Sequence, residues 1–489
     1  MRKILATFVG VFFIGGLLYA AVENIKVSGG IIVNAISEDL SCGSTGLLRI
    51  GPITSPDGVV SATVMTESPD KSNYFTLQAF VQFDADLTEN VYATVRLLNE
   101  TDWGRGDSDT DVDLDQAYIT LKEMIYEPLT LIVGRQPLRY GRGFIVGDPD
   151  TNRAADSNNF APVELSLKKS FDAIRAILDY SPWTIDLVYA RVDEEEIYQA
   201  GDQDLYGINI RYDWSSYNGV TEVYFFAKDK NWYYNYPYAV FGKAGTLSNI
   251  RYGTDYQNKD NKVYCVGIRG QADPTDNWTV WGEAAFQFGN ADYTQFHADQ
   301  TRFVTDNREA WAVQAGAEYR FNNAYNARLG LCYTFLSGDD ENSDEFEEWD
   351  PMFEDQTPAT IMNILFPMTN AHCVIVYGSM MPREDITLWG RYTFLTLAEK
   401  MNIYDGYPNP NDLNITYIAS MRNTDTTYAY RINNNESYLG SEVDLGLNYD
   451  YTEDVQISLS SAVFIPGDWF SSDNDEVAYQ LKAGMRVLF

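Results

Sequence analysis

The chain has 489 residues, of which 70 are acidic and 35 are basic, giving a net charge of −35. Such an acidic chain lacks the basic face that nucleic acids require, so a nucleic-acid partner is excluded. The 35 Tyr, 25 Phe and 10 Trp do not gather in the long apolar runs of a thick soluble core. Apolar residues recur at every second position instead, which is typical of a barrel wall.

The N-terminus has the three parts of a secretory signal peptide. Arg2 and Lys3 precede an apolar run that extends from Ile4 to Ala21 and ends in small residues. We therefore predict a signal peptide over residues 1–21, cleaved after Ala20 or Ala21, and a single barrel domain over residues 22–489. The alternative is a membrane anchor helix, which three glycines within the run disfavour. No later stretch of about 18 apolar residues predicts a transmembrane helix.

Strict alternation of apolar and polar residues predicts about eighteen strands of roughly 8–13 residues, the length that a tilted membrane span needs. The first strand is expected over about 25–36 and the last over 477–489. In the last strand the apolar face runs from Val477 to Phe489, and the polar face holds Gln480, Lys482, Gly484 and Arg486. An alternating strand that closes on a terminal aromatic resembles the recognition signal of bacterial outer-membrane barrels. Phe489 is thus predicted to contact the barrel assembly machinery.

The lengths of the connections alternate along the chain. Short turns are expected near 87–89, 181–182, 271–276, 321–323, 381–384 and 450–454. Long loops are expected near 37–73, 136–169, 229–260, 290–309, 337–371 and 397–437. This alternation predicts an all-β fold, an up-and-down antiparallel transmembrane barrel with short periplasmic turns and long extracellular loops. Its location would be the outer membrane of a Gram-negative bacterium, in contact with lipid and lipopolysaccharide.

Three segments carry a resemblance to a known family. They are LIVGRQPLRYGRGFIVGD with the downstream SFDAIRAILDY (131–180), CYTFLSGDDENSDEFEEWDPMF (332–353) and GSEVDLGLNYDYTEDVQISLSSAVFIPGDWF (440–470). Together and in this order they resemble the alginate export family of outer-membrane porins. The resemblance implies an eighteen-stranded monomeric barrel whose charged lumen selects an anionic polysaccharide.

Carried over by motif position, the resemblance gives five candidate constriction residues: Arg135, Arg139, Arg142, Asp172 and Arg175. Guanidinium groups bind carboxylates in a bidentate way, and opposed charges across a narrow lumen orient permeants. The alternation in its strand turns Arg175 inward. Arg135 shares the phase of the apolar Leu131 and Val133, which favours a position at the rim.

Other inward positions predict a lumen of mixed charge. The expected inward cations include Arg96, Arg320, Arg328, Arg391, Lys482 and Arg486. The expected inward acids include Glu283, Glu318, Glu442 and Asp444. This mixture fits a porin for small solutes almost as well as a polysaccharide channel.

The remaining motifs favour no cofactor, metal site or catalytic centre. The acidic runs at 107–115 and 339–350 lack the Gly and Glu that an EF-hand loop needs, so solvated loop charge is the expected role. His297 and His372 have no nucleophile elbow to complete a hydrolase triad. Cys42, Cys265, Cys332 and Cys373 lack metal-ligand spacing, and their pairing stays open.

Three function classes follow from these patterns. An outer-membrane channel for passage or export of solutes is favoured. The alternative is a non-conducting structural or adhesive barrel that acts through its acidic loops, and a barrel enzyme is the least supported. Planar-bilayer conductance distinguishes the first two.

Overall fold

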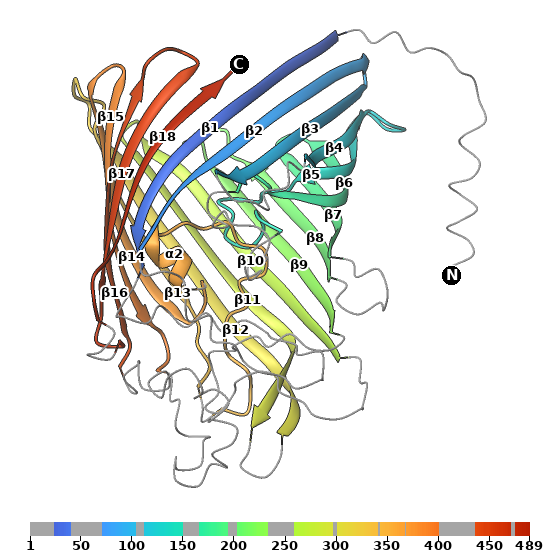
Figure 1. Ribbon diagram of the computed structural model, residues 1–489. Coiled ribbons are helices and arrows are strands. Elements are labelled where there is room, and N and C mark those ends of the chain that lie inside the picture. Colours follow the sequence, from blue (N-terminus) through green and yellow to red (C-terminus); the bar gives the residue numbers. More distant parts are fainter. Residues whose placement is uncertain are drawn as a thin grey trace.

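The chain forms an eighteen-stranded antiparallel sheet that closes on itself, as the computed structural model in Figure 1 shows. Residues 24–40, 71–103, 112–149, 166–193, 203–232, 259–296, 301–340, 343–366, 368–400, 436–470 and 475–489 are described. Each strand pairs with its neighbours in sequence, and β1 also pairs with β18. Closure leaves no sheet edge, so every strand finds backbone partners, as a membrane span requires. The predicted fold and strand count are confirmed.

The strands have the following bounds: β1 Asn24–Asp39, β2 Lys71–Thr88, β3 Val91–Asp102, β4 Asp113–Lys122, β5 Leu129–Pro137, β6 Ser170–Tyr180, β7 Trp183–Asp193, β8 Gln203–Asp213, β9 Val220–Trp232, β10 Lys259–Thr275, β11 Trp278–Phe296, β12 Thr301–Arg320, β13 Arg328–Leu336, β14 Ala371–Arg383, β15 Ile386–Leu397, β16 Tyr438–Asp450, β17 Val455–Pro466 and β18 Ala478–Leu488. A short helix, α2 (Ile361–Leu365), lies between β13 and β14. No helix among the described residues is long and apolar enough to cross a membrane.

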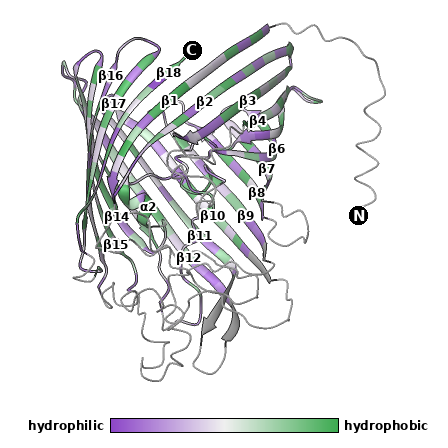
Figure 2. Cartoon of the chain, viewed as in Figure 1, coloured by the Kyte–Doolittle hydropathy of each residue, from purple (hydrophilic) through white to green (hydrophobic). Residues whose placement is uncertain are grey.

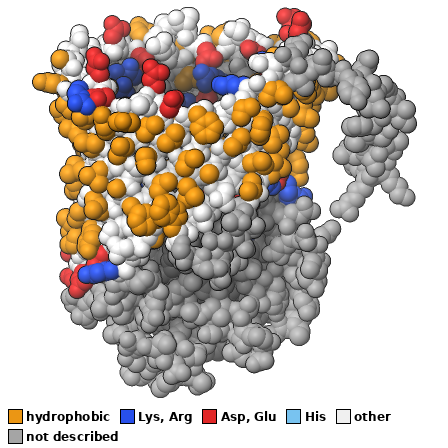
Figure 3. All heavy atoms as spheres, turned by 45° about the horizontal axis from the view of Figure 1, so that its top comes forward, with side chains coloured by type: hydrophobic (Ala, Val, Ile, Leu, Met, Phe, Trp, Pro, Cys, Tyr) orange, Lys and Arg blue, Asp and Glu red, His pale blue; other side chains and the backbone are white. Residues whose placement is uncertain are grey.

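Burial alternates along the strands with the outer face apolar. In β16, Leu445 is 59% exposed while the adjacent Asp444 is 1% exposed. Successive residues point to opposite faces of a strand, so the leucine faces lipid and the aspartate faces the lumen. Figure 2 shows the resulting alternation of hydropathy along the strands. In Figure 3 apolar side chains cover the visible face of the wall, and charged side chains gather at the mouth, at the end of the barrel where the short turns lie.

The strand bounds place the connections at the predicted positions along the chain, with two corrections. Residues 290–309 were expected to form a long loop, but β11 and β12 continue as a paired hairpin from Asn290↔Asn307 to Phe296↔Thr301. Backbone pairing between the two strands thus continues through residues whose sequence does not alternate between apolar and polar. The turn expected at 271–276 lies instead between Thr275 and Trp278, because β10 continues through Thr275. The predicted signal peptide, residues 1–21, lies outside the described residues.

Two connections fold back into the barrel. We call residues 138–149, after β5, and residues 343–366, between β13 and β14, the inward segments. Their buried apolar side chains include Phe144, Val146, Trp349, Phe353 and Ile361. These pack with lumen-facing residues of strands β6 to β18 in one apolar cluster, to which strands β1 to β5 contribute none. A water-excluding core therefore occupies one side of the lumen.

Candidate channel constriction

The first inward segment turns sharply at two glycines of the sequence RYGRG. Gly141 has a φ of +54° and Gly143 a φ of +74°, a left-handed conformation that favours glycine. A Cβ atom on Gly143 would lie 2.9 Å from Cζ of Arg139. The glycine thus allows the Arg139 guanidinium to pack directly against the turn.

The two inward segments are joined through their backbones. The amide N–H groups of Gly147 and Asp148 both donate to the carbonyl oxygen of Phe353, at 2.7 and 3.0 Å. In return, the N–H of Phe353 donates to Ile145 at 3.0 Å, and the N–H of Asp355 donates to Gly143 at 2.8 Å. These bonds satisfy backbone groups that the lumen would otherwise leave unpaired. The two segments therefore form one body inside the barrel.

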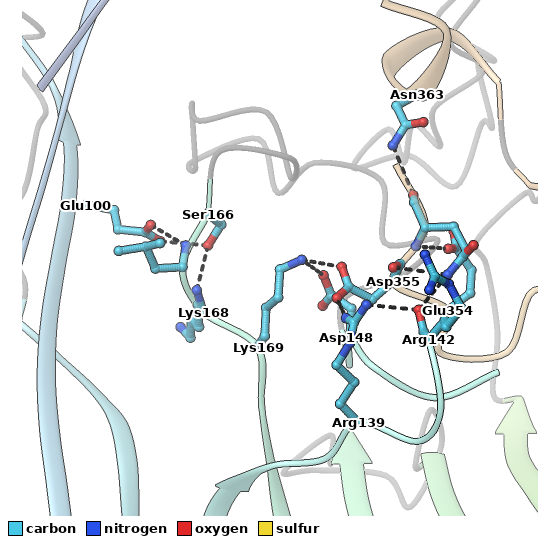
Figure 4. Close-up of polar contacts among 12 residues, drawn as sticks. Glu100, Arg139, Arg142, Asp148, Ser166, Lys168, Lys169, Glu354, Asp355 and Asn363 are labelled. Carbon is cyan, nitrogen blue, oxygen red and sulfur yellow. Dashed lines mark hydrogen bonds and ion pairs between the residues drawn. The ribbon is translucent and has the colours of Figure 1, made fainter. Parts of the chain in front are cut away.

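Ion pairs reinforce this joint. The carboxylate of Asp355 accepts hydrogen bonds from Arg139 and, at 2.5 Å, from Lys169, the residue that precedes β6. Lys169 also lies 3.4 Å from Asp148. Figure 4 shows these side chains converging on Asp355 between the two segments. We call Arg139, Lys169, Asp148 and Asp355 the charge clasp.

Arg142 and Arg175 also face the interior. The Arg142 guanidinium stacks 4.2 Å from the ring centroid of Trp281 on β11. Arg175 on β6 donates from Nε to Asp186 on β7 at 2.7 Å, and its Cζ lies 5.6 Å from the ring centroid of Tyr140. Burial raises the pKa of Tyr140, which therefore stays neutral. The inward orientation expected for Arg175 agrees with this packing.

Arg135 and Asp172 lie elsewhere, which corrects their predicted place in the constriction. The two residues are cross-strand partners joined by a bidentate ion pair, with Nη2 to Oδ2 at 2.7 Å. Asp172 shares the strand phase of Ile174, which is 49% exposed on the outer face. Arg135 likewise shares the phase of Val133, which is 39% exposed. The position of these residues in the family motif predicted that they face the lumen. The alternation of side chains along β5 and β6 turns both side chains outward instead.

The other predicted inward cations differ in their partners. Arg391 on β15 donates to Asp444 on β16 at 2.8 Å and to the carbonyl of Thr357 in the second inward segment at 2.6 Å. Arg328 lies at the short-turn end of β13, 3.8 Å from Glu318. Lys482 and Arg486 share one face of β18, and the described part of the chain places no carboxylate within ion-pair distance of either.

A buried polar cluster fixes the second inward segment against the wall. The carboxylate of Asp350 pairs with Lys228 of β9, and its backbone groups exchange hydrogen bonds of 2.7 and 2.9 Å with Gln287 of β11. Although burial opposes ionisation, Lys228 and Arg308 hold the pKa of Asp350 below its ordinary value.

The pKa of the neighbouring Glu348 is shifted in the opposite direction from that of Asp350. Burial and the adjacent Asp339 raise the pKa of Glu348 well above the ordinary range. The carboxyl keeps one hydrogen bond, from Thr369 at 3.3 Å. Burial therefore favours the neutral form of the Glu348 carboxyl group.

The sequence did not predict Lys169 and Asp355 as site residues, because both lie in stretches expected to be external loops. The available signal was the density of large apolar side chains in 349–362, which includes Trp349, Met352, Phe353, Ile361 and Met362. Exposing so many large apolar side chains in a solvated loop is unfavourable, so the run indicates a segment that folds onto a core.

Comparison with known proteins agrees with this architecture. Residues 62–483 match the alginate export family. The structure of Pseudomonas aeruginosa OccK2 (OpdF) is similar with a TM-score of 0.51 and 10% identity, covering 96% of this chain and 99% of that one. Pseudomonas aeruginosa OccK11 (OpdR) gives a TM-score of 0.50 and 10% identity, with 96% of each chain covered. At these identities the likeness concerns the fold alone. No curated protein matches the sequence.

Proposed function

This chain belongs to the alginate export family of outer-membrane channels, and we propose that it passes an anionic polysaccharide through a charged lumen. The inward segments narrow the barrel on the side of β6 to β17, and the apolar cluster ends at Ala478, the first residue of β18. The route then follows the opposite wall, where β18 and β1 to β3 present polar side chains.

One observation carries the proposal for an anionic cargo. Lys482 and Arg486 face the lumen from β18, without an acidic partner among the described residues. Their cross-strand neighbours on β17 are Ser460 for Lys482 and Gln456 for Arg486, and Gly484 between them pairs with Ser458. These small or neutral neighbours leave the two cations available to a permeating carboxylate.

The acidic groups on β6 to β16 that face the lumen form ion pairs or hydrogen bonds with neighbouring groups. Asp186 pairs with Arg175, Asp444 with Arg391, and Glu222 with Arg269 at 2.5 Å. Glu283 accepts a hydrogen bond of 2.7 Å from the hydroxyl of Tyr224. Within the described chain, the mixed lumen thus carries paired charges along β6 to β16 and cations without an acidic partner on β18. The acids Glu38, Asp84 and Glu100 on β1 to β3 are hydrogen-bonded to neutral groups. Such fixed charges at a narrow place select permeants by sign.

A second candidate is a non-conducting structural or adhesive barrel. The apolar cluster around Phe353 favours it, because a packed core inside the lumen reduces the space for solutes. The two candidates differ in whether an open passage remains along β18 and β1 to β3. The channel requires such a passage, and the structural barrel does not.

Planar-bilayer recording on the purified protein tests the proposal. We expect stable conductance steps and, in a KCl gradient, a reversal potential that shifts toward cation selectivity in the double variant Lys482→Glu/Arg486→Glu. Oligomers of a polyuronate should block the wild-type current more strongly than neutral oligomers of the same length. Arg383→Glu is the matched control, because Arg383 pairs with Asp385 at a short turn and is 60% exposed. Absence of steps both in the wild type and in variants that release the inward segments would favour the structural barrel. Equal block by both oligomers would contradict an anionic cargo.

A further inference from the structure

Glu442 is a fully buried carboxylate in the barrel wall that contacts the second inward segment only through backbone groups. It lies on β16 and is 0% exposed. Its Oε1 accepts hydrogen bonds from the N–H groups of Thr360 and Ile361, at 2.8 and 2.7 Å, and its Oε2 accepts one from Met362 at 2.7 Å. Three hydrogen bonds thus converge on one side chain from another part of the chain.

The helix that begins at Ile361 depends on this carboxylate. The first N–H groups of any helix have no partner within the helix. Thr360, at the N-cap position, makes no side-chain capping bond, and no acidic residue lies in the first turn of α2. With only five residues, α2 is also too short to be stable alone. Glu442 provides the partners that the local sequence lacks.

Two further side chains of the same wall patch hold the residues just before α2. The hydroxyl of Thr393 on β15 donates to the carbonyl of Pro358 at 2.6 Å, and Arg391 donates to the carbonyl of Thr357 at 2.6 Å. Thr393 is the cross-strand partner of Glu442, and Arg391 is that of Asp444. Residues 357–362, which closely follow Asp355 of the charge clasp in the chain, are therefore held at one patch of β15 and β16.

We propose that Glu442 is a positioning residue that holds residues 357–366 against β15 and β16 inside the lumen and thereby sets the width of the channel. The inference rests on the proposed function as a channel. Without the carboxylate, three buried N–H groups lose their acceptor, and the segment exchanges between docked and undocked positions. Loss of these bonds shifts this exchange toward the undocked state by on the order of a hundredfold.

The test compares single-channel currents of the full-length wild type with those of Glu442→Ala and Glu442→Gln in KCl. Glu318→Gln is the matched control, because Glu318 is another inward glutamate but contacts Tyr377, Arg320 and Arg328 of the wall. Thr393→Val removes one bond to the same segment without changing charge, and it provides a second variant if Glu442→Ala folds poorly. Heat-modifiable migration in electrophoresis verifies that each barrel is closed.

We expect Glu442→Ala to show larger or flickering steps, with smaller effects in the same direction from Glu442→Gln and Thr393→Val and no effect from the control. A silent wild type with a conducting Glu442→Ala would equally support the proposal, since the docked segment would then close the channel. If the wild type conducts and all folded variants match its step size and noise, the role of Glu442 is refuted while the channel stands. Silence of every variant would overturn both.

Discussion

The carboxylate of Asp355 and the guanidinium of Arg139, separated by 216 residues in the chain, are bound to each other inside the barrel. This pair joins a connection after β5 to one before β14, and Lys169 adds a second cation to the same carboxylate. Because the pair is made by two connections and not by the wall, it fixes their relative position independently of the barrel.

We predict that Arg139→Glu separates the inward segments and destabilises their joint by about 1–2 kcal/mol, a value discounted for the half-exposed arginine. The introduced carboxylate and that of Asp355 would repel each other, and the current should become noisier. The double variant Arg139→Glu/Asp355→Arg restores opposite charges. A double-mutant cycle on melting temperature and current noise measures the coupling. Additive effects of the two single variants would contradict the pairing.

Arg175→Glu and Arg135→Glu form a matched pair of charge reversals on neighbouring strands. Arg175 faces the lumen beside Asp186, so its reversal should shift the reversal potential in a KCl gradient and cost about 3 kcal/mol by leaving two buried acids together. Arg135 faces outward, so its reversal should leave ion selectivity unchanged. An equal shift from both variants would contradict the outward placement of Arg135.

Glu348→Gln should stabilise the protein as the pH rises. The pKa of Glu348 is raised in the folded state, so its contribution to stability is complete below the ordinary carboxyl pKa and is lost as the pH rises through the raised value. Glutamine keeps the hydrogen bond from Thr369 but cannot ionise. The melting temperature of the variant should therefore exceed that of the wild type by an amount that grows as the pH rises above the ordinary carboxyl pKa. A difference independent of pH would contradict the raised pKa.

Gly143→Ala should weaken the charge clasp. The left-handed φ of +74° strains any residue with a Cβ atom, at a cost of about 1–2 kcal/mol, and the added methyl group would displace the Arg139 guanidinium, whose Cζ lies 2.9 Å from that position. The matched control is Gly270→Ala, since a Cβ there would meet only the carbonyl oxygen of Val220, at 3.9 Å. Melting temperatures of the two variants give the comparison. Equal destabilisation would show that the position of Gly143 has no special constraint.

The wall of this barrel was predictable from the sequence because its physics is local. The alternation of side chains along a strand is enough to assign Leu445 to the outer face and Asp444 to the lumen. The alternation of short and long connections indicates that each strand pairs with the next one in sequence. The same rule, applied to Asp172 beside Ile174, would have placed that carboxylate outside. Family motif position was the weaker guide there.

The interior was not predictable in the same way. The contact of Glu442 with Met362 joins positions 80 residues apart, and that of Arg139 with Asp355 joins positions 216 residues apart. No periodicity encodes either pairing. What the sequence does hold is the apolar run around Phe353, which is out of place in a solvated loop. Its burial partners depend on how the connections fold back across the closed sheet.

The one-sided apolar cluster gives the barrel wall unequal stiffness. From β6 to β18 the sheet is backed by packed side chains, whereas from β1 to β5 no residue joins that cluster. A single sheet bends more readily than two bonded layers, so elastic deformation under lateral membrane pressure should concentrate in the arc from β1 to β5. Amide hydrogen exchange would then be fastest along this arc, although each of its strands pairs with a neighbour on both sides.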